Sequence, residues 1–220
     1  MKNYWIIGFI TLAMACAPTR YVRTLDKGQQ ALGLSVGGPI IEFSGSKIPL
    51  PLSTLSYGYG LKDNLTLFGS IHPTSLAFYN IQTDFGAVYK IYDQKKYIPY
   101  ISAVLAGNLV IDMNDPVVRF WPEADVNFSW TYGKGNNFFY TGCSNWFELR
   151  KTRSGDQPQI GHWLFNPHFG HTFKHKSMQY NLELKLLAPG RSHENVFIPW
   201  KSLTGSTGAT GIYFSIIKTF

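Results

Sequence analysis

The chain ends in GIYFSIIKTF, residues 211–220, a stretch that reads as a β-strand continuing to the last residue. Ile212, Phe214 and Ile216 share one face of such a strand, because side chains along a strand alternate with a period of two. Chain ends are usually loose and polar. We therefore expect a last strand that stops on Phe220 to be paired with another strand and held in an apolar environment.

The composition favours strands and turns over helices. Of 220 residues, 45% are hydrophobic and 16% aromatic, only 15% are charged, and there are 21 glycines. Such a composition excludes disorder. The net charge of +7 comes without a basic helix or an aromatic RNA-binding motif, which argues against a nucleic-acid partner. The basic residues cluster in short turns, an arrangement that suits a surface facing anionic lipid head groups.

The N-terminus MKNYWIIGFITLAMAC has the features of an export signal: a lysine, a short apolar run and small residues before Cys16. We predict a signal peptide over residues 1–15 and an N-terminal tether over 16–29. LAMAC resembles a bacterial lipobox, which implies lipidation of Cys16. The alternative is that Ala13-Met14-Ala15 is an ordinary signal-peptidase site. The other cysteine, Cys143, is expected to be a free thiol on a strand.

Ten later segments alternate between large apolar and small or polar residues. They are 30–36, 53–61, 64–72, 79–92, 97–107, 118–132, 137–149, 162–173, 178–187 and the C-terminal strand. In the clearest, 118–132, Val126 and Phe128 lie on one face while Asp125 and Asn127 lie on the other. The apolar face of this strand is suited to contact with lipid, and its polar face is suited to contact with water.

The connections between these segments alternate in length. Four are tight polar or Gly-containing turns, at 62–63, 93–96, 133–136 and 174–177. The others are longer: 37–52, 73–78, 108–117, 150–161 and 188–208. In an up-and-down meander all four tight turns fall at one end, an asymmetry typical of transmembrane barrels.

We therefore predict an all-β fold, a ten-stranded antiparallel up-and-down transmembrane β-barrel over residues 30–220. The alternative is eight strands, with residues 30–36 packing elsewhere. An even strand number places both termini on the same side of the membrane, expected to be the periplasmic side.

The C-terminal pattern of Ile212, Phe214, Ile216 and Phe220 resembles the assembly signal of bacterial outer-membrane β-barrel proteins, although Lys218 departs from it. The resemblance extends from about Gln30 to Phe220 and points to no particular family. It implies two partners, outer-membrane lipid and the barrel-assembly machinery that reads the strand ending at Phe220. Pairing of the last strand with the first would leave no edge unsatisfied in lipid.

Alternation places several charged side chains inside the barrel, where they are expected to pair as a polar network rather than line a continuous pore. They are Asp84, Lys90, Arg119, Glu123, Asp125, Glu183 and Lys185. No metal site is expected. His162 and His168 face inward on a strand, His171 faces outward and His175 lies in a turn, so no three converge.

Three functions follow from these features. The first is a small non-enzymatic barrel acting as a membrane-integrity, surface-binding or accessory component, with no cofactor. The alternatives are a narrow channel for small solutes and an outer-leaflet lipid-modifying enzyme. For the enzyme, the candidate groups are His175 and Ser177 in a short turn, or four groups at the outer rim. These four are Asp112, Asp115, His193 and Glu194.

Overall fold

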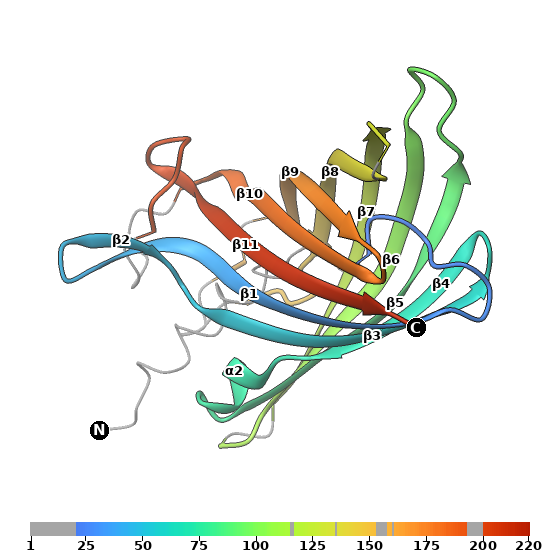
Figure 1. Cartoon of the computed structure of the whole chain (residues 1–220). Coiled ribbons are helices and arrows are strands. Elements are labelled where there is room, and N and C mark those ends of the chain that lie inside the picture. The colour runs from blue at the N-terminus through green and yellow to red at the C-terminus, as the bar shows by residue number, and fades with distance from the viewer. Residues whose placement is uncertain (1–20, 115–116, 135, 153–157, 160, 193–199) are drawn as a thin grey trace.

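The computed structural model describes residues 21–114, 117–134, 136–152, 158–159, 161–192 and 200–220. It is built almost entirely of antiparallel strands (Figure 1). The strands are β1 (Gln30–Phe43), β2 (Ser46–Pro49), β3 (Leu52–Lys62), β4 (Leu65–Ile71), β5 (Asn80–Tyr92), β6 (Tyr100–Asp112), β7 (Val118–Tyr132), β8 (Asn137–Phe147), β9 (Trp163–His175), β10 (Met178–Ser192) and β11 (Thr207–Thr219). One short helix, α2 (Pro73–Leu76), follows β4.

Ten of these strands form a closed barrel. Each pairs with its neighbours in the order β1, β3, β4 and onward to β11, and β11 pairs back onto β1 from Ala31↔Thr219 to Pro39↔Gly211. The ten-stranded prediction is confirmed. The eight-strand alternative is wrong, because residues 30–36 pair with both β3 and β11 and complete the wall. β2 pairs with the far end of β1 and forms a hairpin that projects beyond the wall (Figure 1).

The tight turns lie at one end of the barrel, which we call the short-turn end. The C-terminus lies at this end as well (Figure 1). Lys96, Asn136 and Lys176 have positive φ angles of 51°, 56° and 53° there, as tight reversals often require. The opposite, long-loop end carries the β2 hairpin and α2. The predicted strand 97–107 begins later, at Tyr100, because Lys95 and Ile98 bridge across the preceding turn.

The two faces of the wall differ in polarity. On β7, Asp125 and Asn127 are buried in the barrel interior, and on β10 Glu183 is buried between the exposed Leu182 and Leu184. The outward side chains are therefore mostly apolar, whereas the interior holds polar and charged side chains together with some apolar ones such as Phe68 and Trp121. This arrangement is the reverse of a water-soluble barrel.

Candidate functional site

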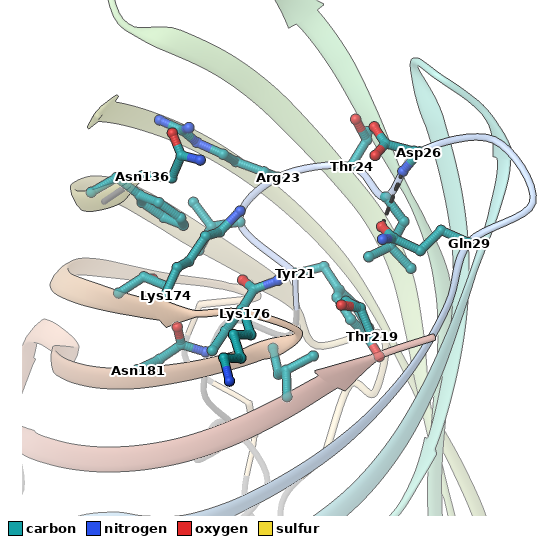
Figure 2. Close-up of a pocket in the computed structure, with 16 residues that line it drawn as sticks. Tyr21, Arg23, Thr24, Asp26, Gln29, Asn136, Lys174, Lys176, Asn181 and Thr219 are labelled. Atoms are coloured by element: carbon teal, nitrogen blue, oxygen red, sulfur yellow. Dashed lines mark hydrogen bonds between the residues drawn. The ribbon is translucent and has the colours of Figure 1, made fainter. Parts of the chain in front are cut away.

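Residues 21–29, which precede β1, are called the N-terminal plug and lie at the short-turn end of the barrel (Figure 2). Residues 21–25 are buried or half-buried in the barrel mouth, whereas residues 26–28 are exposed. Tyr21 and Leu25 are buried in one apolar cluster with Phe68 and Val88 of the wall. Part of the segment predicted as a tether is thus packed in the barrel mouth. Whether residue 16 anchors the chain stays a prediction.

The backbone of the plug is hydrogen-bonded to side chains of the wall. Ser102 Oγ donates to the carbonyl of Val22 at 2.6 Å, and the N–H of Leu25 donates to Thr66 Oγ1 at 2.7 Å. Both wall hydroxyls are buried. Buried backbone groups need such partners, so the interior hydroxyls of β4 and β6 stabilise an inserted peptide segment.

Two glycines of β3 make room for the plug. A Cβ on Gly60 would collide with the carbonyl of Asp26, and one on Gly58 would contact the Tyr21 ring at 2.7 Å. The N–H of Gly28 also donates to the carbonyl of Gly60 at 2.8 Å. The plug therefore lies directly against this strand, at positions where only glycine leaves enough space.

Arg23 is the charged group of the plug. Its Nε donates to Ser129 Oγ at 2.8 Å and its Nη1 to Thr131 Oγ1 at 2.7 Å, while the guanidinium lies 4.2 Å from the centre of the Phe138 ring. Burial lowers the pKa of Arg23 to about 10. Arg23 therefore remains a cation at neutral pH.

A cavity of about 250 Å³ lies between the plug and the ends of β8, β9, β10 and β11, and we call it the mouth cavity. Figure 2 shows the plug on one side of this space and wall side chains on the other. The wall residues include Asn136, Phe138, Thr172, Lys174, Lys176 and Asn181. Its lining is mostly polar, which suits water or a polar ligand better than an apolar one.

Four of the predicted lumen charges come together at mid-height and form what we call the central network: Glu123, Asp125, Glu183 and Lys185. Lys185 Nζ lies 3.5 Å from Glu183 Oε1, and the two side chains are each only 2% exposed. Asp125 interacts electrostatically with the other three. Tyr140 donates its hydroxyl to Glu183 Oε2 at 3.0 Å. Three carboxyl groups therefore share one ammonium group in the barrel interior.

Neighbouring side chains extend the central network across the lumen. Ser144 Oγ donates to Glu123 Oε1 at 2.9 Å and accepts the indole N–H of Trp146 at 3.1 Å. On the other side, His168 Nε2 and Asn127 Oδ1 are hydrogen-bonded at 2.8 Å. All except Glu123 are buried. The lumen at this height is filled by side chains.

Asp84 lies apart from the central network, in a cluster of its own. It accepts a hydrogen bond from Ser70 Oγ, and its Oδ2 lies 2.8 Å from His72 Nε2. His72 Nδ1 in turn is 3.4 Å from Thr54 Oγ1. The order hydroxyl, imidazole, carboxylate is that of a hydrolase triad. All four side chains are buried, however, and the hydroxyl contact is long, so the cluster is better explained as hydrogen bonding of a buried carboxylate.

The two remaining predicted lumen charges lie nearer the ends of the barrel. Lys90 forms an ion pair with Asp93 at 3.2 Å beside a short turn. Arg119 is half-buried at the long-loop end, where it interacts electrostatically with Glu148 and Asp112. The seven predicted residues thus form separate groups instead of one continuous network.

The histidines are dispersed. His168 lies in the lumen, while His171 is hydrogen-bonded to Tyr132 at 2.6 Å. His162 was expected on a strand facing inward, but it precedes β9, is exposed and contacts the carbonyl of Glu148 at 2.6 Å. Within the described residues, no three His, Cys, Asp or Glu side chains are placed to hold a metal ion.

Several predicted positions lie outside the described residues: the signal peptide, Cys16, Asp115, His193 and Glu194. Cys143, by contrast, is on β8 with a free thiol.

The outer surface of the barrel carries a belt of exposed apolar side chains, with at least one from every wall strand. Representative members are Leu34, Leu55, Leu67, Phe85, Leu105, Phe120, Phe139, Phe169, Leu182 and Phe214. Water-soluble proteins rarely expose an apolar surface of this extent. In the part of the chain that the structure describes, no helix is long and apolar enough to cross a membrane.

Aromatic side chains gather on the outer surface toward the short-turn end. Trp130 stacks on Phe139 with ring centres 5.2 Å apart, and its indole N–H donates to the carbonyl of Tyr97. Aromatic girdles at the lipid–water boundary have this composition. The closed fold, apolar exterior and polar interior together define the class: the chain is a β-barrel of the type found in bacterial outer membranes.

Solved structures with a similar fold include an outer-membrane channel from Pseudomonas putida F1, with a TM-score of 0.48 and 11% identity over 93% of this chain and 100% of that one. Another is the translocator domain of the autotransporter NalP from Neisseria meningitidis, with a TM-score of 0.47 and 8% identity over 89% of this chain and 90% of that one. No protein-family model and no curated protein matches the sequence. At such identities no activity is carried over to this chain.

Proposed function

We propose that this chain is a small, non-enzymatic barrel of the bacterial outer membrane that is closed rather than conducting. It would act as a membrane-integrity, surface-binding or accessory component. The observation that carries this proposal is the N-terminal plug, whose Tyr21 and Leu25 are buried among wall side chains at the short-turn end. The side chains around the central network support it, because they fill the lumen at a second height.

Toward the long-loop end a third layer of side chains continues the filling of the lumen, and Trp146 belongs both to this layer and to the central network. Val110, Trp121 and Trp146 form a buried apolar cluster inside the wall, and the indole N–H of Trp121 donates to Glu148 at 2.8 Å. Solute passage would require rearrangement at all three heights. This is the reason for preferring a closed barrel to the alternative of a narrow channel.

The orientation that we propose places the short-turn end and both termini in the periplasm, with the long loops outside. Short periplasmic turns and longer external loops are the general rule for such barrels. The proposed partners are outer-membrane lipid and the barrel-assembly machinery, the latter through β11 and Phe220. In support, β11 pairs along most of its length with both β1 and β10.

We predict that Gly60→Ala opens the short-turn end. The added methyl would collide with the carbonyl of Asp26 and displace the plug. In planar bilayers the wild type should be nearly silent and Gly60→Ala should conduct more often. A protease added on the short-turn side should also cut within residues 21–25, which are buried or half-buried in the wild type, faster in Gly60→Ala. Gly190→Ala is the matched control, since a Cβ there meets no atom within 4 Å. Steady wild-type conductance would instead favour a narrow channel for small solutes.

We further propose that the chain is anchored by lipidation of Cys16. Metabolic labelling with a fatty acid should mark the wild type and leave Cys16→Ser unmarked. Cys143→Ser is the control, because Cys143 lies within β8 and should not affect labelling. An unlabelled wild type would reject lipidation and leave the barrel unaffected.

A further inference from the structure

The mouth cavity carries an excess of positive charge. Arg23, Lys174 and Lys176 line it, whereas Asp26 is the acidic residue among its described lining residues and is itself exposed. Within the described chain, none of the three cations forms an ion pair with a carboxylate. Arg23 repels Lys174, and the attraction of Lys174 to Asp26 is the weaker of the two interactions. An anion in the cavity would remove this repulsion.

Two of the cations flank a single aromatic ring. The Arg23 guanidinium carbon and Lys174 Nζ lie 4.2 and 5.6 Å from the centre of Phe138. The ring limits the positions these side chains can adopt, and Arg23 is further held by Ser129 and Thr131. Arg23 and Lys174 are therefore held beside the cavity, whereas Lys176 is exposed at its edge. Figure 2 shows the three side chains around this space.

Hydrogen-bonding groups in the same cavity lack partners. Thr172 lines it, is only 1% exposed, and its Oγ1 has no hydrogen-bond partner among the described residues. Arg23 Nη2 is likewise buried without a partner. Buried polar groups are rarely left unsatisfied. A ligand that accepts hydrogen bonds from both groups would satisfy them.

The size and the donor set select the chemistry of the ligand. A cavity of about 250 Å³ lies just below the usual volume of small-molecule sites, so it would hold a molecule of roughly a dozen heavy atoms or fewer. A phosphate monoester has several acceptor oxygens and carries between one and two negative charges at neutral pH. It matches a guanidinium, a hydroxyl and two ammonium groups better than a single carboxylate does.

We propose that the mouth cavity binds a small phosphate monoester, with Arg23 and Lys174 contacting the phosphate and Thr172 donating to one of its oxygens. Lys176 and Asn181 complete the cavity wall. This inference goes beyond the closed-barrel function, and binding does not depend on whether the barrel conducts.

Calorimetric titration of the purified barrel in neutral detergent with glycerol 3-phosphate tests the site. The wild type should bind one equivalent, with an affinity that falls as salt is added, and glycerol should not bind. Lys174→Gln should weaken binding about tenfold or more, the effect of losing a charged hydrogen bond. Lys62→Gln is the matched control, an exposed lysine at the end of β3 that does not line the cavity.

Thr172→Val separates a binding role from a structural one. The substitution removes a hydroxyl with no partner, so the ligand-free barrel should be as stable as the wild type or more stable in urea. Binding should nevertheless weaken about tenfold, and Thr172→Ser, which keeps the hydroxyl, should restore it. If the Thr172 hydroxyl only supported the fold, Thr172→Val would lower the stability of the barrel as well as its affinity for the ligand.

Competition experiments identify the source of the phosphate. If phosphatidic acid in nanodiscs displaces glycerol 3-phosphate from the wild type and phosphatidylcholine does not, the monoester comes from a lipid head group. If only soluble esters compete, the ligand is a free metabolite-sized phosphate. Both results support the site. Absence of binding by every phosphate probe, or equal weakening by Lys62→Gln and Lys174→Gln, would overturn it, whatever the bilayer conductance shows.

Discussion

An arginine in place of Leu105 is expected to destabilise the membrane-inserted barrel by about 2–4 kcal/mol, the cost of a lipid-facing arginine near the bilayer midplane. Leu105 lies near the middle of β6 and is 68% exposed, with its neighbour Val104 buried in the lumen. If lipid covers this surface, the guanidinium has no water to solvate it. Urea titration of the barrel folded into phosphatidylcholine vesicles measures the difference in free energy of unfolding.

Leu203→Arg is the matched control for this experiment. Leu203 is 73% exposed but lies in the connection before β11 at the long-loop end, outside the apolar belt. The same substitution there should change stability by no more than about 0.5 kcal/mol, as is usual for surface positions. Equal tolerance of arginine at Leu105 and Leu203 would place β6 in water and contradict the membrane-spanning assignment.

The barrel could be predicted from the sequence because its determinants are local. Alternation along a strand, as at Tyr57, Gly58 and Tyr59, identifies both the strand and its outward face within a few residues. The tight polar and Gly-containing turns between consecutive segments predict that these strands are antiparallel neighbours. Even the last strand was correctly predicted, since Ile212 and Phe214 point outward from a paired strand, β11.

The plug was not foreseen because its contacts are non-local. Nothing in residues 21–29 distinguishes a tether from an inserted segment, and the partners of Arg23, Ser129 and Thr131, are separated from it by more than a hundred residues. The one local signal is the pair of glycines on β3, Gly58 and Gly60, which pack against the plug. Glycines in a strand frequently mark a close backbone approach.

Interior aromatics were missed for a different reason. The lumen residues predicted from the sequence are all charged, yet Trp121 and Trp146 are also buried on the lumen side. Alternation alone would have placed Trp121 inward, since it has the same parity as Glu123 and Asp125. Asp84 lies opposite Ser70 in the pairing of β4 with β5. His72 is two residues after Ser70 and on the same face, so this pairing also accounts for the contact between His72 and Asp84.

Lys185→Met is expected to destabilise the barrel by about 3–5 kcal/mol, the usual cost of removing one partner of a buried ion pair. Lys185 is the ammonium group of the central network, and Glu123, Asp125 and Glu183 would be left in the lumen without it. Methionine has a similar length and packs well, so the loss would reflect charge rather than volume. Urea titration in vesicles, with heat-modifiable gel migration as a check of barrel closure, measures it.

A second substitution distinguishes electrostatics from packing. Glu183→Gln in the Lys185→Met background removes one of the uncompensated charges while keeping an acceptor for the Tyr140 hydroxyl. The double variant should therefore be more stable than Lys185→Met alone, and a double-mutant cycle should give an interaction energy of about 0.5–3 kcal/mol between the two positions. If the losses of stability caused by Lys185→Met and Glu183→Gln were simply additive, the 3.5 Å contact between Lys185 and Glu183 would contribute nothing to stability. The central network would then stabilise the barrel only through packing.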